Sequence, residues 1–257
     1  MLVIRSLIFN ILFYAALIVL LIVGLPALFI NRFAVFYLAL LWAKATFWLM
    51  RVICGTHVEF RGIENIPKGP CIVAPKHQSI WEVFALPPFF TDFTFILKRE
   101  LTWIPFFGWY LGRADLTAIN RSKGAAALAQ AKARAHEALA AGRQLVIFPE
   151  GTRRPAAAPP QYKFGVAHIY ADNSVPCVPV ALNSGLFWAR RSFLRRPGTI
   201  IVEFLPPIPP GYDKNIFYQL LCARLETASD RIIGEALQQN PELKAVVPAD
   251  WESRRAG

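Results

Sequence analysis

The sequence predicts an α/β protein with helices on both faces of a β-sheet, preceded by a hydrophobic membrane segment. The chain of 257 residues is 55% hydrophobic, with a mean hydropathy of +0.37. This is too apolar for an ordinary soluble domain and too mixed for a polytopic transporter. Nearly all of the apolar excess lies in the first fifty residues, and short strand-like runs alternate with charged helical patterns after it. We therefore expect a membrane-anchoring helical segment at residues 1–52 and one folded domain at residues 53–257.

The N-terminal segment contains an uncharged run at residues 6–31, with an arginine on either side. Its length suits a bilayer-spanning helix of about twenty residues, and Pro26 lies near its end, where a kink or a helix exit is least costly. A second apolar run, 33–50, carries Lys44 and is predicted to form either an interfacial or re-entrant helix or a second span. A cleavable signal peptide is less favoured, because the apolar core is too long and no small-residue cleavage site precedes the second run.

The remainder of the chain alternates strand and helix patterns. The short β-type runs are 56–60, 71–74, 93–97, 116–119, 145–148, 178–182 and 199–204. An alanine-rich helix is predicted at about 122–141, closed by Gly142, and a long final helix at about 213–239, stopped by Pro241. Such alternation is typical of a sheet covered on both faces, with the functional site in loops at the strand ends.

Charge and cysteine content limit the classes of partner. The formal net charge is +11 and the pI about 9.8, which favours anionic partners. The adjoining hydrophobic anchor favours lipid headgroups, since a basic residue at a membrane surface gains roughly 1 kcal/mol from anionic lipid. We find no nucleic-acid-binding signature. The four cysteines form no C-x-x-C pair, so we expect neither a disulfide framework nor a zinc site, and a reducing compartment fits better.

The segment 74–82, APKHQSIWE, directly follows a predicted buried strand. His77 and Glu82 would lie about 140° apart on one helix, so they pair only if His77 sits on the loop and the helix begins at Ser79. A histidine oriented by a carboxylate is suited to removing a proton from an alcohol. The alternative is structural, because Ser79 and Glu82 also match a capping box. One carboxylate has two oxygens and can serve both roles.

The segment 145–154, LVIFPEGTRR, is a strand running into a turn with two arginines. Gly151 permits close backbone approach, and Arg153 and Arg154 can fork onto a phosphate. Glu150 is expected to be a buried carboxylate that orients a ligand, or alternatively half of a salt bridge that closes the turn.

A third cluster runs from 96 to 121 and combines Lys98, the apolar stretch WIPFFGWYLG and Arg121. Aromatic residues beside cations suit a surface where an acyl chain enters and a headgroup is held. By itself the cluster is better interpreted as a core helix with solvated flanking charges.

Together these segments resemble the glycerolipid acyltransferase family typified by 1-acylglycerol-3-phosphate acyltransferase. The family signature is H-x-x-x-x-D, a block ending in Arg, F-P-E-G-T-R, and a V-P-x-x-P block. The matching residues are His77 with Glu82, GRADLTAINR ending at Arg121, FPEGTR at 148–153 and VPCVPV at 175–180. The order and spacing agree from about residue 55 to 185, and four ordered blocks are a strong signal.

The resemblance implies a mixed β-sheet covered by helices, and it implies roles for the site. His77 would deprotonate the acceptor hydroxyl, and Glu82 would orient it. The glycerol phosphate would be held by the FPEGTR residues Glu150, Gly151, Thr152 and Arg153, with Lys98 and Arg121. Glu82 departs from the family Asp, which moves the carboxylate by about one C–C bond and can alter acceptor preference. Lys76 replaces the Asn often found before the histidine.

The implied reaction moves a fatty acyl group from acyl-CoA or acyl carrier protein to the sn-2 hydroxyl of lysophosphatidate, giving phosphatidate. It needs no metal and no tightly held cofactor, and its partners are membrane lipids and the two substrates, not nucleic acid. The expected location is the bacterial inner membrane, with residues 53–257 as the catalytic domain on the cytoplasmic side. The alternatives are an acyltransferase for another lysolipid such as lyso-ornithine lipid, a serine hydrolase using Ser79 or Ser184, and a non-enzymatic basic membrane-surface binding protein.

Overall fold

The structure, a computed structural model, describes residues 1–120 and 124–256. Within this part the strands form one seven-stranded sheet in the order β1-β7-β6-β2-β5-β3-β4. Their bounds are β1 Thr56–Arg61, β2 Ile72–Pro75, β3 Phe93–Lys98, β4 Thr117–Ile119, β5 Gln144–Val146, β6 Cys177–Leu182 and β7 Gly198–Phe204. Each predicted run overlaps one strand. The run predicted at 145–148 ends earlier, at Val146, because the turn toward Pro149 begins there.

The sheet is mixed, as the resemblance implied. β6 and β7 pair antiparallel, whereas β1 and β7, β6 and β2, β2 and β5, β5 and β3, and β3 and β4 pair parallel. The strands from β6 to β4 therefore share one direction, and their carboxyl ends meet at the same edge of the sheet.

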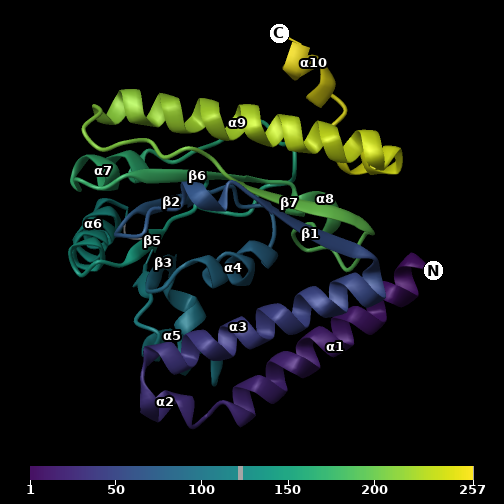
Figure 1. Cartoon of the computed structure of the whole chain (residues 1–257), viewed down its shortest axis with the longest axis horizontal. Coiled ribbons are helices and arrows are strands. Elements are labelled where there is room, and N and C mark those ends of the chain that lie inside the picture. Colours follow the sequence, from purple (N-terminus) through teal and green to yellow (C-terminus); the bar gives the residue numbers. More distant parts are fainter. Residues whose placement is uncertain (121–123, 257) are drawn as a thin grey trace.

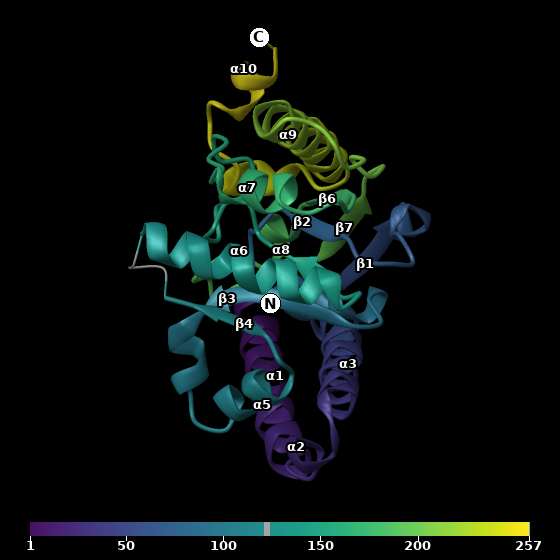
Figure 2. The same ribbon diagram turned by 90° about the vertical axis from the view of Figure 1, so that its left-hand side faces the viewer.

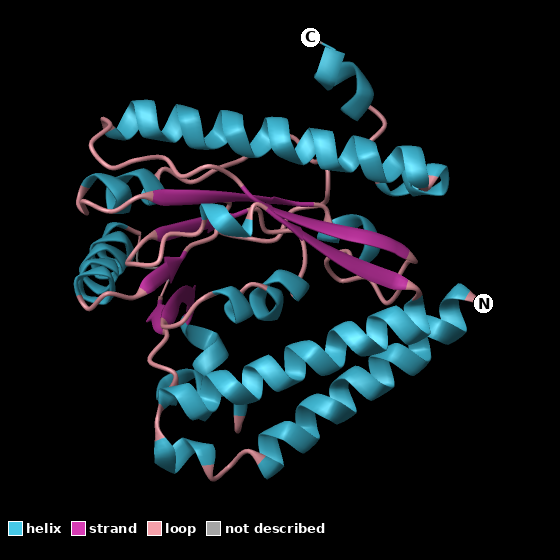
Figure 3. Cartoon of the chain, in the orientation of Figure 1, coloured by secondary structure: helices cyan, strands magenta, loops and turns pink. Residues whose placement is uncertain are grey.

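Helices cover both faces of the sheet (Figures 1 and 3). On one face α6 (Ala125–Ala140), α7 (Gly165–Ala171) and α9 (Lys214–Gln239) pack in a single core with Ile72 and Ala74 of β2. On the other face α4 (Trp81–Ala85) and the N-terminal helices pack in a core with Val73. Alternate residues of β2 thus enter different cores, which explains why this strand is apolar throughout. The remaining helices in the described chain are α5 (Phe107–Arg113), α8 (Ser184–Phe187) and α10 (Trp251–Ala256), with short helical turns at 63–65, 87–89, 99–103 and 241–246.

The N-terminal segment forms a helical hairpin rather than one long helix. α1 (Leu2–Val23) is followed by the short α2 (Ala27–Ile30) and by α3 (Arg32–Leu49), which continues as a π-helical turn to Cys54. The first helix has 22 residues, close to the expected length of about twenty, and it ends before Pro26, near which a kink or helix exit was predicted. It ends at Val23 because Gly24 lies at its C-cap and Pro26 begins α2. Both Leu2–Val23 and Arg32–Cys54 are long and apolar enough to cross a membrane.

The hairpin lies below the sheet with α5 beside it (Figure 2), and side chains attach both of its ends to the rest of the chain. Near the start of α1, Phe9 and Phe13 pack on Trp188 with ring centroids 5.3 and 5.2 Å away. At the other end, Tyr110 donates to the Leu21 carbonyl (2.7 Å), and the Arg113 guanidinium donates to the carbonyls of Leu28 (2.9 Å) and Ile30 (2.7 Å). The hairpin is thus held along its length against α4, α5 and the sheet.

Candidate active site

The predicted site residues gather at the carboxyl edge of the parallel strands, where sites of open α/β sheets are found. His77 follows β2 by two residues, the turn 148–153 follows β5, and Lys98 is the last residue of β3. Arg121, which follows β4 in the sequence, lies outside the described residues. The strand order thus brings together segments that are more than seventy residues apart.

The structure brings His77 and Glu82 into contact, with 3.0 Å between His77 Nδ1 and Glu82 Oε1. His77 lies on the loop and Glu82 in the first turn of α4, so the glutamate folds back toward the ring. The His77 side chain is 15% exposed and that of Glu82 is fully buried. A ring that donates from Nδ1 to a carboxylate leaves Nε2 as the basic atom.

Glu82 also holds the loop in place. Its Oε1 accepts from the backbone N–H groups of Gln78 (2.6 Å) and Ser79 (2.7 Å), and Oε2 accepts from the Ser184 hydroxyl (3.0 Å). The hydrogen bond from the Ser79 N–H is the glutamate half of the capping box. The helix itself begins at Trp81, whose N–H is accepted by the Ser79 hydroxyl at 3.2 Å. One buried carboxylate therefore bonds both the His77 ring and the N–H groups before α4, with Ile80 rather than Ser79 at the N-cap. A role of Glu82 in catalysis stays a prediction.

The FPEGTRR turn holds His77 from three directions. The Phe148 ring stacks on the imidazole at a centroid distance of 3.9 Å and an interplanar angle of 20°. The His77 N–H donates to Glu150 Oε2 at 2.7 Å, and the His77 carbonyl accepts from the Arg154 N–H at 2.7 Å. Ring and backbone of the histidine are fixed by one turn.

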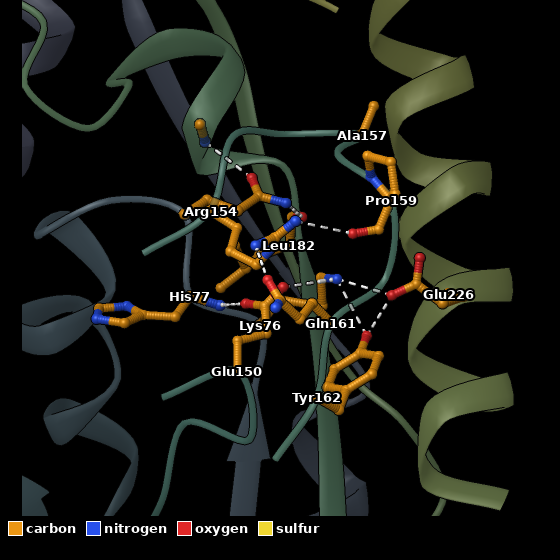
Figure 4. A network of polar contacts seen from close by, with 12 residues as sticks. Lys76, His77, Glu150, Arg154, Ala157, Pro159, Gln161, Tyr162, Leu182 and Glu226 are labelled. Carbon is orange, nitrogen blue, oxygen red and sulfur yellow. Dashed lines mark hydrogen bonds and ion pairs between the residues drawn. The ribbon is translucent and has the colours of Figure 1, made fainter. Parts of the chain in front are cut away.

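Glu150 is buried, with 2% of its surface exposed. Its second oxygen, Oε1, lies 3.0 Å from the Lys76 ammonium. Burial raises the pKa of the Glu150 carboxyl, whereas Lys76 and the N–H of His77 favour its charged form. Both oxygens are engaged by the chain itself (Figure 4), an arrangement suited to positioning His77. Contact of Glu150 with a glycerol phosphate stays a prediction.

The other predicted phosphate ligands differ in their availability. Gly151 adopts a left-handed backbone (φ +67°) that turns the chain, and Thr152 is exposed. Arg153 is partly exposed, and Lys98 is 57% exposed and pairs with Glu100 at 3.2 Å. The Arg154 side chain binds Gln161 and the Pro159 carbonyl, and its contact with a phosphate stays a prediction.

Sequence reasoning missed three residues of this site. Ser184 was considered only as a nucleophile, but it is fully buried and bonds Glu82. Gln78 connects the loop to the end of β6, since its amide donates to the Leu182 carbonyl (3.0 Å) and accepts from the Gly185 N–H (2.9 Å). Phe148 stacks on His77. Each of the three follows a strand of the parallel part of the sheet by a few residues. This position was the signal by which the sequence could have indicated them.

An apolar cavity of about 150 Å³ lies between the hairpin, α4, β3 and α5. Its lining includes Leu20, Trp42, Phe84, Phe95 and Tyr110. The cavity wall reaches the site, because the Phe95 ring stacks on Phe148 at 6.1 Å and Phe148 stacks on His77. No group of three or more His, Cys, Asp or Glu side chains in the described chain is arranged to hold a metal ion. All four cysteines are free thiols.

A mixed sheet with a histidine and a carboxylate at its carboxyl edge, beside an apolar cavity, matches a known family. The family model described as Acyltransferase matches residues 57–183, and the chain belongs to this family. Over 165 residues the chain is 41% identical to a 1-acyl-sn-glycerol-3-phosphate acyltransferase of Pseudomonas aeruginosa, and over 170 residues 29% identical to one of Saccharomyces cerevisiae. These matches cover 64% and 65% of this chain.

The matched segments span less than two thirds of those relatives, namely 64% of the bacterial and 56% of the yeast protein. The crystal structure of the 1-acyl-sn-glycerophosphate acyltransferase PlsC from Thermotoga maritima is similar over a longer stretch. It gives a TM-score of 0.68 at 25% identity and covers 88% of this chain and 98% of that one. The likeness includes most of the fold described above.

Proposed function

We propose that this protein transfers a fatty acyl group from acyl-CoA or acyl carrier protein to the sn-2 hydroxyl of lysophosphatidate, giving phosphatidate. The observation that carries the proposal is the contact of His77 with the buried Glu82, and the His77 ring is connected to an apolar cavity through the stacked rings of Phe148 and Phe95. The bacterial and yeast relatives are 1-acyl-sn-glycerol-3-phosphate acyltransferases, which supports the choice of acceptor.

In the proposed reaction His77 Nε2 takes the proton of the acceptor hydroxyl as its oxygen attacks the thioester carbonyl. The carbonyl oxygen becomes an oxyanion, stabilised by backbone N–H groups. When the tetrahedral intermediate collapses, the C–S bond breaks and the imidazolium returns the proton to the departing thiolate. Glu82 stabilises the imidazolium meanwhile. No protein residue is acylated, and the acyl thioester is a co-substrate, so the proposal needs neither a metal nor a resident cofactor.

The phosphate of the acceptor is proposed to bind Arg153, with Thr152 and the backbone at Gly151, and further Lys98 and Arg121. Partial exposure of Arg153 and Lys98 at the strand edge that carries His77 supports this assignment for those two. A guanidinium binds phosphate oxygens bidentately, which fixes the glycerol relative to the base.

The apolar cavity is proposed to hold the acyl chain. Its lining residues come from α1, α3, α4, β3 and α5, so an acyl chain there would lie between the hairpin and the sheet with its reactive end toward His77. A buried methylene contributes about 0.8 kcal/mol, so the depth of such a cavity controls which chain lengths react fastest.

Filling the cavity is therefore expected to shift chain-length preference. Ala39→Phe places a ring where the cavity is lined by the small Ala39 of α3. Excluding two methylenes costs about 1.6 kcal/mol, so the kcat/KM ratio of long-chain to short-chain donors should fall about tenfold. Ala129→Phe, at an exposed position of α6, is the matched control. If the ratio of kcat/KM for long-chain and short-chain donors is unchanged in Ala39→Phe, the acyl chain binds elsewhere.

Residues 1–52 are proposed as the membrane anchor and 53–257 as the catalytic domain. The outer face of α1 exposes large apolar side chains, and so does the segment from the helical turn at 99–103 through α5, with Trp103 (64%), Phe106 (44%) and Trp109 (57%). Because both ends of the hairpin are bonded to the domain, we propose that it lies within one leaflet instead of crossing the bilayer. The free thiols support a cytoplasmic catalytic domain, at the inner membrane of a bacterium.

The proposal is tested by supplying purified protein with lysophosphatidate and either acyl-CoA or acyl carrier protein, and measuring phosphatidate by mass spectrometry. Lyso-ornithine lipid and other lysophospholipids serve as competing acceptors. We expect phosphatidate formation to dominate with at least one donor. If another lysolipid is acylated faster than lysophosphatidate, that lysolipid is the acceptor. Labelling of the protein by a serine-directed fluorophosphonate would favour a serine hydrolase. No acylation of any acceptor would leave a membrane-binding protein.

A further inference from the structure

Lys76, the residue before His77, is a buried cation with every donor engaged. Its side chain is 7% exposed, and Nζ lies 3.0 Å from Glu150 Oε1, 2.7 Å from Glu226 Oε1 and 3.0 Å from the Tyr162 hydroxyl. An ammonium has three N–H donors, so these three contacts use all of them. Tyr162 in turn bonds Glu226, and its ring lies 4.9 Å from Nζ. Figure 4 shows Lys76 between Glu150, Tyr162 and the α9 residue Glu226.

This cluster is connected to the proposed base through one carboxylate. Glu150 contacts Lys76 with Oε1 and accepts the His77 N–H with Oε2. The His77 carbonyl is fixed from the opposite side by the Arg154 N–H, so the backbone of the base is held at both polar groups. A displacement of Glu150 would therefore move His77 relative to Glu82.

The charge of Glu150 depends on its neighbours. Burial raises the pKa of this carboxyl, and Lys76 is the largest influence in the opposite direction. The titratable and charged groups of this region are Lys76 and His77 after β2, Tyr162 before α7, and Cys222 and Glu226 on α9. Lys76 is the cation of this set that lies against Glu150. Without it, Glu150 would bind a proton at a higher pH and become a weaker acceptor for the His77 N–H.

We propose that Lys76 is a positioning residue, which keeps Glu150 charged and in place so that Glu150 fixes His77 in its reactive geometry. Lys76 is itself held by Glu226 of α9 and by Tyr162, which precedes α7. The inference rests on the proposed function, since it assigns Lys76 to the same reaction. It also accounts for a lysine before the histidine. Burial of an ion pair by itself contributes little net stability, so a purpose beyond folding is consistent with its retention here.

The test compares Lys76→Met with Lys132→Met, which removes a cation from the surface pair with Asp172. We expect Lys76→Met to lower kcat about 10- to 100-fold with little change in the KM for lysophosphatidate, because a misplacement of about 1 Å can cost about 100-fold in rate. The acid limb of its kcat profile should move to higher pH, since protonation of Glu150 then begins at higher pH. Lys132→Met should behave as the unmodified protein.

Glu150→Gln provides the second arm, because the amide oxygen still accepts a hydrogen bond but carries no charge. If Lys76 acts through Glu150, adding Lys76→Met to Glu150→Gln should change kcat by less than about twofold. The double variant buries fewer unpaired charges than Lys76→Met alone, so the comparison stands even if the single variant fails to fold. A full additive loss in the double variant would overturn the proposal.

An activity-independent readout separates this inference from the proposed function. Labelling with ¹⁵N-histidine gives backbone amide signals for the four histidines, and the His77 amide proton, bonded to a carboxylate, should lie downfield. In Lys76→Met it should move upfield and titrate with Glu150, while the other three stay unchanged. An unmoved His77 amide with unchanged kcat would make Lys76 purely structural. If the His77 amide shifts in Lys76→Met but the protein acylates no acceptor, the proposed function is contradicted and the link from Lys76 through Glu150 to His77 is not.

Discussion

Replacing His77 by alanine is expected to lower acyl transfer about 10²- to 10⁴-fold, the usual contribution of a general base. The loss should appear in kcat, because the ring contacts the reacting proton and the phosphate ligands remain. Folding should persist, since Glu82 keeps its bonds to the N–H groups of Gln78 and Ser79 and to Ser184. The measurement is phosphatidate formation at saturating substrates, with Tm and vesicle binding recorded on the same preparation.

The matched control is His136→Ala. His136 is exposed on α6 and pairs with Asn173 at 3.0 Å, away from the site. Its rate should equal that of the unmodified protein. A His77→Ala protein that is folded, binds vesicles and retains the full rate would remove His77 as the base and with it the proposed mechanism.

Glu82→Gln is expected to have the second largest effect, a loss of about 10²-fold or more in kcat. The substitution keeps the size of the side chain but removes the charge that stabilises the imidazolium. An amide can also present its NH₂ group to Nδ1, which would favour the wrong tautomer. Glu137→Gln, an exposed position paired with Arg134, is the matched control and should leave kcat unchanged. Equal rates for Glu82→Gln and the unmodified protein would show that the carboxylate only caps α4.

Glu82→Ala should add a loss of stability to the loss of rate. It leaves the buried N–H groups of Gln78 and Ser79 without their acceptor, and each such group costs about 1–3 kcal/mol. The midpoint of denaturant unfolding should therefore fall in Glu82→Ala and much less in Glu82→Gln. This difference separates the capping role of the side chain from its role beside His77.

The family aspartate gives a further comparison at the same position. In this chain the loop is built around the longer side chain, whose Oε1 meets three donors at once. A shorter carboxylate cannot reach all of them without a backbone shift. The glutamate is therefore matched to its own loop, and the family pattern does not by itself define the optimum here.

The fold and the pairing of His77 with Glu82 were accessible from the sequence because they depend on local patterns. Strand periodicity and turn residues can be recognised in short stretches of sequence. The spacing of His77 and Glu82 required the histidine to lie on a loop if the two are to pair. The exit of the first helix near Pro26 was predicted too, because glycine and proline end helices through their own backbone geometry. The partners of the Arg154 side chain were not accessible from the sequence, because side-chain direction in a turn depends on the following loop.

By itself the sequence determined the series of strands, the apolar N-terminus and the residues able to act as base and orienting carboxylate. Only the tertiary structure decided which distant residues surround them. Ser184 meets Glu82 across 102 positions, and Glu226 meets Lys76 across 150. The physical reason is that local propensity fixes an element and its faces, whereas the order of strands in the sheet sets which loops share an edge. That order results from packing the whole chain, and no window of the sequence contains it.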